Sequence, residues 1–318
     1  MNDRIIHCVS ISGGKDSAAT AILALETQQR ENLRFVFADT GNEHESTYEY
    51  IAYMGEHLGI QIATIKADFT GDIERKRRYI LEKWRGKGVS EADCERAAAA
   101  LQPTGNPYLD LCMMKGRFPS TMAAFCTQEL KVMPLMEYQL GYIERGEADA
   151  VWSWQGVRLD ESQSRKRRLQ GTGACVKSFE VVGGGVFNNR PILRWKAADV
   201  FEAADLYGLK PNPLYKQGMT RVGCMPCINA GKDEVLEISK RFPEHIARIA
   251  EWERLVALTS KRMEASFFPD PTRDAHLDKR GIYKVVQWSK TQRGGKLVDW
   301  IRATEEPKAC DSAYGLCE

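Results

Sequence analysis

The sequence predicts an α/β fold: a doubly wound, parallel, five-stranded sheet followed by a helical C-terminal region. Two observations lead to this fold class. Short runs rich in β-branched and aromatic residues alternate with segments of helical composition, and the first run, residues 5–11, leads into a glycine-rich loop. Because a helical crossover returns the chain to the same edge of a sheet, this alternation is typical of parallel strands.

The individual elements follow from these patterns in chain order. We predict strands at residues 5–11, 34–38, 60–65 and 148–154, and a short fifth strand around Val186. Helices are predicted at residues 17–25, 45–58, 72–100, 120–138, 197–206 and 234–261. Residues 102–110, with two prolines and a glycine, and the basic run at 165–168 are predicted to be loops. We therefore expect a sheet-containing domain over residues 1–230 and a helical region with a cysteine-containing tail over residues 231–318.

Composition narrows the class of protein. The 318 residues are 43% hydrophobic and 28% charged, and their formal net charge is +2 at pH 7. These values are ordinary for a globular protein, and the charge alone does not argue for a nucleic-acid or membrane partner. No apolar run approaches the roughly 20 residues of a membrane helix, and the start of the chain lacks the apolar stretch of a signal peptide. We therefore expect a cytoplasmic protein.

A phosphate site is predicted at the loop between the first strand and the first helix. This phosphate loop consists of Ser12, Gly13, Gly14, Lys15, Asp16 and Ser17. Glycine-rich loops at such a position expose backbone N–H groups, and the helix adds the positive end of its dipole. Lys15 adds a cation, the serines add hydroxyl donors, and Asp16 is suited to holding Mg²⁺ that bridges phosphates. The alternative is a glycine-rich turn with incidental polar residues.

A second polar cluster is predicted at the end of the second strand. Asp39, Thr40 and Gly41 end this strand, and ligand contacts in doubly wound sheets gather at the carboxyl ends of strands. Asp39 is suited to contact a ribose or a metal ion. The alternative, compatible with binding, is that Asp39 or Thr40 caps the next helix. His44 lies near enough in sequence to contact a ligand, although a lone histidine is more often a hydrogen-bonded structural residue.

Several segments resemble one enzyme superfamily. The phosphate loop lacks the Walker A spacing and resembles the SGGxDS loop of the ATP-pyrophosphatase (PP-loop) and PAPS-reductase superfamily, where PAPS is 3′-phosphoadenosine 5′-phosphosulfate. Similar matches to PAPS-reductase motifs occur at residues 39–48, 125–134, 156–165 and 191–227, the last of which ends in GCMPC. The resemblance implies a HUP-like sheet, an adenine nucleotide as ligand, and contacts of Arg158 and Arg165 with its phosphates.

Within this superfamily, the phosphate loop favours ATP over a sulfonucleotide. Sulfonucleotide reductases generally lack a lysine at the position of Lys15, because their nucleotide has no β-phosphate. Lys15 and Asp16 therefore imply that ATP is cleaved to AMP and pyrophosphate, with the lysine stabilising the departing charge. The expected reaction adenylates a substrate, from which sulfur supplied by a donor protein displaces AMP (thiolation). The alternatives are a PAPS or adenylyl-sulfate (APS) reductase that releases sulfite with a thioredoxin-like reductant, and a nucleotide-binding component of a DNA-modification or defence complex.

Nine cysteines are many for a reduced compartment, and we expect some of them to bind metal. Cys224 and Cys227 have the CxxC spacing of metal sites, and Cys126 matches a cluster cysteine of the iron–sulfur members of the family. Those members have two adjacent cysteines where this chain has Phe125 and Cys126, so Cys112 is our candidate for the fourth ligand. Four thiolates are suited to a [4Fe–4S] cluster or to zinc. The alternative is buried thiols without a metal.

The C-terminal tail contains two further candidates, Cys310 and Cys317. Their segment loosely resembles the C-terminal ECG(I/L)H segment of sulfonucleotide reductases, which holds a nucleophilic cysteine. The resemblance implies a catalytic nucleophile or a persulfide carrier, and the alternative is a frayed terminus with inert thiols. Basic runs at 74–78, 165–168 and 279–296 are compatible with binding of a nucleic-acid substrate. Solvated helix faces are the simpler interpretation of these runs. The sequence also leaves open whether the protein is a homodimer or a component of a larger complex.

Overall fold

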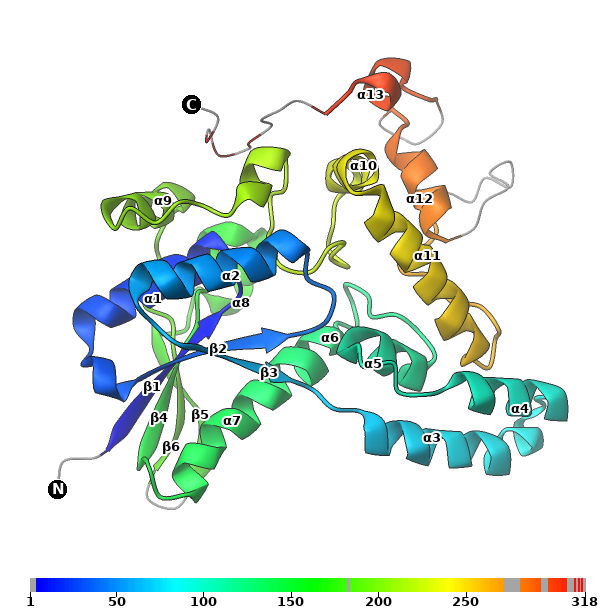
Figure 1. The fold of residues 1–318 in the computed structure, drawn as a ribbon, viewed down its shortest axis with the longest axis horizontal. Coiled ribbons are helices and arrows are strands. Elements are labelled where there is room, and N and C mark those ends of the chain that lie inside the picture. The colour runs from blue at the N-terminus through cyan, green and yellow to red at the C-terminus, as the bar shows by residue number, and fades with distance from the viewer. Residues whose placement is uncertain are drawn as a thin grey trace.

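The computed structural model describes residues 4–181, 184–271, 281–292 and 297–307, together with residues 312, 314 and 316. Its centre is a six-stranded sheet with the strand order β3-β2-β1-β4-β6-β5 (Figure 1). The strands are β1 Ile5–Ile11, β2 Leu33–Asp39, β3 Ile62–Lys66, β4 Ala150–Trp154, β5 Cys175–Val181 and β6 Gly184–Asn189. All neighbours pair in parallel except β5 and β6. The predicted α/β fold is therefore confirmed, with one strand more than the five predicted.

The additional strand, β5, pairs antiparallel with β6 at the edge of the sheet. The prediction relied on strands separated by helices, and an antiparallel edge strand has no helical crossover to reveal it. The basic run at 165–168, predicted to be a loop, instead lies in helix α8, Gln163–Leu169. Ser162 caps this helix by accepting a hydrogen bond from the backbone N–H of Arg165 at 3.2 Å, which is a start signal that the prediction overlooked.

Helices cover both faces of the sheet. Val9 and Ile11 of β1 pack in one core with residues of α1 (Lys15–Thr27), α2 (Glu45–Leu58) and α9 (Ala197–Leu206). Ile6 and Cys8 of the same strand pack on the opposite face with residues of α7 (Met133–Glu144). This division follows from the period of two in a strand, which sends successive side chains to opposite faces. The sheet is thus buried on both sides, and its strand ends are left to form a site.

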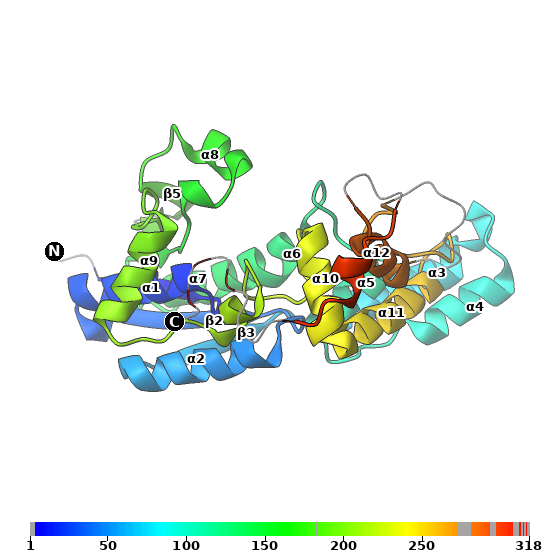
Figure 2. The ribbon, with the colours of Figure 1, turned by 90° about the horizontal axis from the view of Figure 1, so that it is seen from above.

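A separate helical layer lies beyond the edge of the sheet near β3 (Figures 1 and 2). Its main helices are α3 Thr70–Lys83, α4 Glu91–Ala100, α5 Pro107–Lys115, α10 Lys232–Arg241, α11 Pro243–Leu258 and α12 Ile282–Ser289. They share one hydrophobic core, which contains residues from both sides of position 230. The division of the chain at that position stays a prediction. The described part also contains the short helices α6 Phe125–Thr127 and α13 Trp300–Thr304, a π-helix Gln128–Val132, and 3₁₀ helices at Arg30–Asn32, Arg85–Lys87, Leu159–Glu161 and Pro213–Gln217.

Several predicted helix boundaries differ from those observed. The segment 72–100 forms two helices, because Gly88 adopts φ +80° between them. The segment 234–261 is also two helices, which meet at Phe242 because Pro243 has no N–H to continue the first. The predicted loop at 102–110 ends early, since Asn106 caps α5 by accepting from the N–H of Leu109 at 3.0 Å. Among the helices of the described residues, none is both long and apolar enough to cross a membrane.

Candidate functional site

The phosphate loop connects the end of β1 to the start of α1, as the sequence predicts. Gly13 adopts φ +70°, and a Cβ at this position would lie 2.7 Å from Cγ2 of Thr47 in α2. The side-chain amide of Asn212 donates to the carbonyl of Gly13 at 3.1 Å. Only glycine fits this combination of a left-handed backbone and a close neighbouring helix. The loop is therefore fixed between α2 and the segment that contains Asn212.

Hydroxyl groups fix the rest of the loop. Ser17 donates through Oγ to the carbonyl of Gly14 at 2.8 Å and accepts from the N–H of Ser12 at 3.2 Å. The phenol oxygen of Tyr215 accepts from the N–H of Lys15 at 3.0 Å. These bonds hold the start of α1, where the positive end of the helix dipole favours an anion.

Three charged side chains meet at this helix start. The ammonium of Lys15 lies 3.2 Å from one carboxylate oxygen of Asp16, and Nε of Arg158 pairs with the other. Lys15 and Arg158 are only 8% and 2% exposed. Burial acts to lower the pKa of Arg158, but the carboxylates of Asp16, Glu161 and Asp160 together raise it above its usual value. Gly156 permits the arrangement, since a Cβ there would lie 2.8 Å from the backbone carbonyl of Asp16.

Two tyrosine rings cover the ammonium group of Lys15. Its Nζ lies 5.4 Å from the ring centre of Tyr215 and 5.0 Å from that of Tyr314, distances typical of cation–π contacts. The hydroxyl of Tyr314 also donates to the carbonyl of Thr220 at 3.0 Å. Part of the C-terminal segment thus lies at the phosphate loop. The predicted tail residues Cys310 and Cys317 lie outside the described residues, and their roles stay predictions.

Asp39 lies at the end of β2, next to β1 in the sheet, and is 4% exposed. Its carboxylate accepts hydrogen bonds from the N–H of Gly41 at 2.9 Å and from the hydroxyl of Tyr48 at 2.7 Å, and it pairs with Nζ of Lys66 at 2.8 Å. Burial acts to raise the pKa of Asp39, but the bonds from Lys66, Tyr48 and Gly41 together hold it below its usual value. Asp39 is therefore a fixed carboxylate at the sheet edge where the sequence places a ligand contact.

The two predicted arginines differ in their surroundings. Arg158 contacts the phosphate loop through Asp16, whereas Arg165 lies in α8 and pairs with Glu161 about one turn earlier. Helix α8 stands out from the sheet (Figure 2). The structure therefore joins Arg158 to the loop, and a phosphate contact of Arg165 stays a prediction.

The CxxC segment packs against the loop that follows β2. Glu43 and Cys224 form an isolated antiparallel bridge, and the N–H of Met225 donates to the carbonyl of Asn42 at 2.7 Å. Arg248 of α11 donates to the side chain of Asn42 at 3.0 Å and to the carbonyl of Met225 at 2.7 Å. These bonds bring the CxxC segment to the same sheet edge as the phosphate loop.

Three of the four candidate metal-binding cysteines, Cys126, Cys224 and Cys227, surround the side chain of Lys131, and Cys112 is a neighbour of Cys126. Burial raises the pKa of Cys224 to about 12, and burial followed by the proximity of Cys227 raises that of Cys126. Burial, and to a smaller extent Cys126, raises the pKa of Cys112 well above its usual value. Cys224 is in turn the main cause of a raised pKa at Lys131. The thiols of Cys112, Cys126 and Cys224 are thus protonated near neutral pH.

The sequence did not reveal several residues that build the site. Asn212 and Tyr215 belong to a segment that resembles the family, but no spacing rule connects Tyr215 to a loop 200 positions earlier. Glu43 is buried and accepts from the N–H of Thr40 at 3.1 Å, and Cys224 lies 3.6 Å from its carboxylate. Such contacts depend on packing across the sheet edge, for which a sequence pattern gives no signal.

Comparison with known proteins agrees with this geometry. Residues 6–230 match the sequence model of the phosphoadenosine phosphosulfate reductase domain. An uncharacterized 37.8 kDa protein of Escherichia phage 186 is 45% identical over 98% of this chain and 97% of its own length. The phosphoadenosine 5′-phosphosulfate reductase of Vibrio campbellii is 22% identical over 67% of this chain and 64% of its own length.

Solved structures include a more distant relative. The phosphoadenylyl-sulfate (PAPS) reductase from Candida auris, in a phosphate complex, aligns with a TM-score of 0.38 and 16% identity over 70% of this chain and 81% of its own. The family assignment does not depend on that alignment, because the sequence match alone spans most of the chain. This chain therefore belongs to the phosphoadenosine phosphosulfate reductase domain family of the adenine nucleotide α-hydrolase-like superfamily, a family of nucleotide-binding proteins.

Proposed function

We propose that this protein binds ATP at the phosphate loop and cleaves it between the α- and β-phosphates, giving pyrophosphate and an adenylated substrate for sulfur transfer. The observation that supports this most is the buried ammonium of Lys15 beside Asp16 and Arg158. A fixed lysine at a helix N-terminus suits a reaction whose leaving group is pyrophosphate, because it stabilises the charge that develops there. A sulfonucleotide has no β-phosphate on which a lysine could act in this way.

The proposed first step is an in-line displacement at the α-phosphorus. A nucleophilic oxygen of the acceptor forms a bond to that phosphorus, and the bond to the bridging oxygen breaks. The electron pair of the broken bond leaves with pyrophosphate, whose charge Lys15 stabilises. Arg158 acts as a positioning residue, because its guanidinium fixes the carboxylate of Asp16. In the second step, sulfur from a donor protein displaces AMP from the adenylated acceptor.

Asp16 suits the proposed role of holding Mg²⁺. Its two carboxylate oxygens contact Lys15 and Arg158, but each oxygen has a second lone pair that can bind a cation. Bound there, Mg²⁺ would bridge phosphate oxygens and reduce their repulsion of an incoming nucleophile. Asp39 is proposed to contact the ribose from the neighbouring strand end.

The cysteines add a finer proposal that the reaction steps above do not require. Thiols are the ligand type of [4Fe–4S] and zinc sites, and the proposed set is Cys112, Cys126, Cys224 and Cys227. What supports it is that Cys126, Cys224 and Cys227 lie around Lys131 and that Cys112 is a neighbour of Cys126. The thiols would lose their protons on binding the metal. Anaerobic visible spectroscopy with iron and sulfide analysis tests it. Iron and sulfide in equal amounts are expected, and a colourless, metal-free protein isolated under those conditions would contradict the cluster.

A second candidate function is a PAPS or APS reductase, favoured by the match of residues 6–230 to the reductase domain. In that case Cys310 or Cys317 would be the nucleophile and a thioredoxin-like protein the reductant. The experiment that separates the two reactions supplies one enzyme preparation with each nucleotide. Mg²⁺-ATP is offered with candidate acceptors, including tRNA and DNA, and AMP and pyrophosphate are measured. PAPS and APS are offered with thioredoxin, and sulfite is measured.

Variants sharpen this comparison. Lys15→Met is expected to lower the rate of pyrophosphate release about 100-fold, the usual effect of removing one group that stabilises transition-state charge. Lys87→Met, which changes an exposed lysine near the start of α4, is the matched control. Sulfite release from PAPS, with no AMP released from ATP, would replace the proposal with the reductase. Full activity of both Cys310→Ser and Cys317→Ser would remove the reductase candidate. ATP binding without turnover, together with stable partners in a pull-down, would instead indicate a nucleotide-binding component of a complex.

A further inference from the structure

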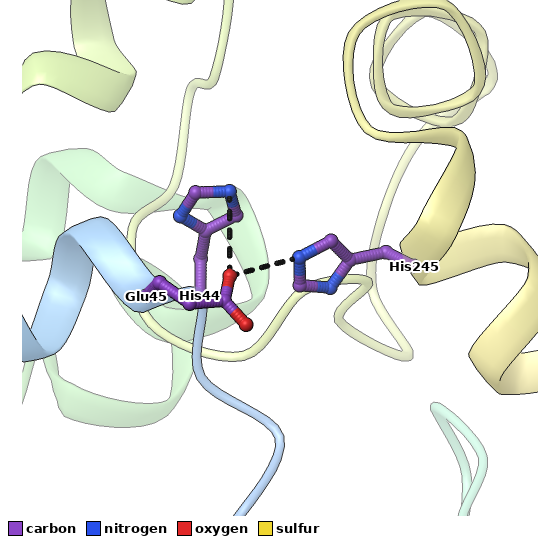
Figure 3. A group of neighbouring side chains, drawn as sticks. All are labelled: His44, Glu45 and His245. Atoms are coloured by element: carbon purple, nitrogen blue, oxygen red, sulfur yellow. Dashed lines mark hydrogen bonds and ion pairs between the residues drawn. The ribbon is translucent and has the colours of Figure 1, made fainter.

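A group of metal-ligand side chains lies apart from the phosphate loop and from the cysteines. Figure 3 shows His44, Glu45 and His245, which come from the start of α2 and the first turn of α11. Among the described residues, their ligand atoms form a set in which all members lie within 4.8 Å of one another. Nε2 of His245 lies 3.2 Å from Oε2 of Glu45, and Nε2 of His44 lies 3.8 Å from the same oxygen.

We propose that His44, Glu45 and His245 bind a divalent transition-metal cation of the zinc class, through two imidazole Nε2 atoms and one carboxylate oxygen. Zinc bonds to nitrogen and oxygen of about 2.0–2.2 Å in a tetrahedron place the ligand atoms about 3.3–3.5 Å apart. The observed separations of 3.2 and 3.8 Å are within a few tenths of an ångström of that range. The ligand atoms of the two histidines lie within 4.8 Å of each other, so the imidazole rings must rotate to complete a tetrahedral site.

The two imidazoles are held in place by different neighbours. Their rings stack with centres 4.9 Å apart and planes inclined by 17°. Phe242 packs edge-on against His44 at 4.5 Å, and His245 is 2% exposed in the first turn of α11. The carboxylate of Glu45, by contrast, is largely exposed to solvent. A cation can therefore enter from the solvent side and keep a water as its fourth ligand.

The local charges favour a cation. The nearby charges are the carboxylates of Glu45 and Glu244 and the guanidinium of Arg248, and their sum is negative.

Two existing contacts must change when a metal binds: the hydrogen bond between Nε2 of His245 and the carboxylate of Glu45, whose two atoms both become ligands, and the helix cap made by His44. Nδ1 of His44 accepts from the N–H of Ser46 at 3.0 Å, and this bond caps α2. A neutral imidazole that coordinates through Nε2 carries its proton on Nδ1, so the cap is given up. Loss of such a cap lowers an equilibrium constant by a factor of about five. That factor is small against the several powers of ten that nitrogen and oxygen ligands contribute to zinc affinity.

The position of the site indicates its role. His44 follows β2, and its N–H donates to the carbonyl of Gly223 in the CxxC segment at 3.4 Å, whereas His245 belongs to the helical layer. A cation held by both would join the sheet edge to the helical layer beside the nucleotide site. The inference is independent of the proposed ATP reaction, because none of its ligands belongs to the phosphate loop.

The test measures metal binding directly on the full chain. After chelator treatment, the protein is titrated with Zn²⁺ by calorimetry and with Co²⁺ by visible spectroscopy. In the double variant Cys224→Ser, Cys227→Ser, where the proposed thiol site is removed, one tight site is expected, with cobalt bands of tetrahedral nitrogen and oxygen coordination. Glu45→Gln and His245→Asn are each expected to weaken this site at least about tenfold. Glu45→Gln is the safer variant, since its exposed side chain can change with little effect on folding.

Matched controls separate this site from other metal-binding groups. His57→Gln removes an exposed histidine from the far end of α2 and is expected to leave the affinity unchanged. The double variant Cys224→Ser, Cys227→Ser is expected to keep the cobalt bands. Zn²⁺ binding of equal strength in wild type, Glu45→Gln and His245→Asn would overturn the proposal. So would the absence of micromolar binding in wild type, or the loss of every cobalt band in the double variant Cys224→Ser, Cys227→Ser.

Discussion

Replacing Gly13 by alanine tests the structural requirement for glycine in the phosphate loop. A left-handed backbone with φ near +70° costs a non-glycine residue about 1–2 kcal/mol. The new methyl group would lie 2.7 Å from Cγ2 of Thr47 and 3.3 Å from its carbonyl oxygen, and such overpacking costs about 1–3 kcal/mol. Alanine recovers up to about 1 kcal/mol by restricting the unfolded chain. The expected loss in the free energy of unfolding is therefore about 1–5 kcal/mol.

A second substitution separates the two contributions. Thr47→Ser removes the methyl group that the new side chain meets and should by itself lower stability by about 1 kcal/mol, the value of one buried methyl group. Urea unfolding of wild type, both single variants and the double variant gives the coupling energy. We expect Gly13→Ala to be about 1–3 kcal/mol less harmful in the Thr47→Ser background, and ATP affinity measured by calorimetry to recover with it. Equal losses in both backgrounds would show that contact with Thr47 does not determine the residue at position 13.

Three further predictions concern contacts that hold the site and the helical layer. Arg158→Met should lower stability by about 1.5–3 kcal/mol in urea unfolding, the usual range for a hydrogen bond to a charged group, because Asp16 keeps only Lys15 as a buried partner; equal urea midpoints for variant and wild type would refute this. Asn106→Ala should lower stability by about 1–2 kcal/mol, since Asn106 both caps α5 and donates to the carbonyl of Gly41 at 2.7 Å; an unchanged urea midpoint would contradict both roles. Burial raises the pKa of Glu253, so its carboxyl group stays protonated to a higher pH in the folded chain than in the unfolded chain. The contribution of Glu253 to stability therefore falls as the pH rises above the usual carboxyl pKa. Glu253→Gln should therefore show a smaller decrease in stability between pH 5 and pH 8 than wild type.

Much of the fold follows from local sequence patterns, and the site follows only in part. β1 and the phosphate loop are recognisable because a buried strand and a glycine-rich loop are each local features. β5 was missed because an antiparallel edge strand lacks the helical crossover on which the prediction relied. Arg158 was found only through a family resemblance, and its partner Asp16 lies 142 positions earlier. Contacts across such distances depend on how the strands order in the sheet, which local patterns do not encode.

The paired histidines are a second example of a contact between distant segments that local sequence patterns do not encode. The sequence left two interpretations of His44 open, a ligand contact or a hydrogen-bonded structural residue. Its partner His245 belongs to a helix packed against it from the other layer, and the sequence contains no HxxxH spacing that would connect them. Ligand sets assembled from distant segments become visible only when the packing of those segments is known.

The contacts of Asn212 and Tyr215 with the phosphate loop also have a consequence for synthesis on the ribosome. The loop emerges near the start of translation, but the side chains that fix Gly13 and Lys15 are made about 200 residues later. At 5–20 residues per second, roughly 10–40 seconds separate the two events. During that interval the nascent chain contains the whole phosphate-binding motif without the groups that fix its shape. High-affinity nucleotide binding should therefore begin only after residue 215 has left the exit tunnel, so that ATP stabilises nearly complete chains rather than early fragments.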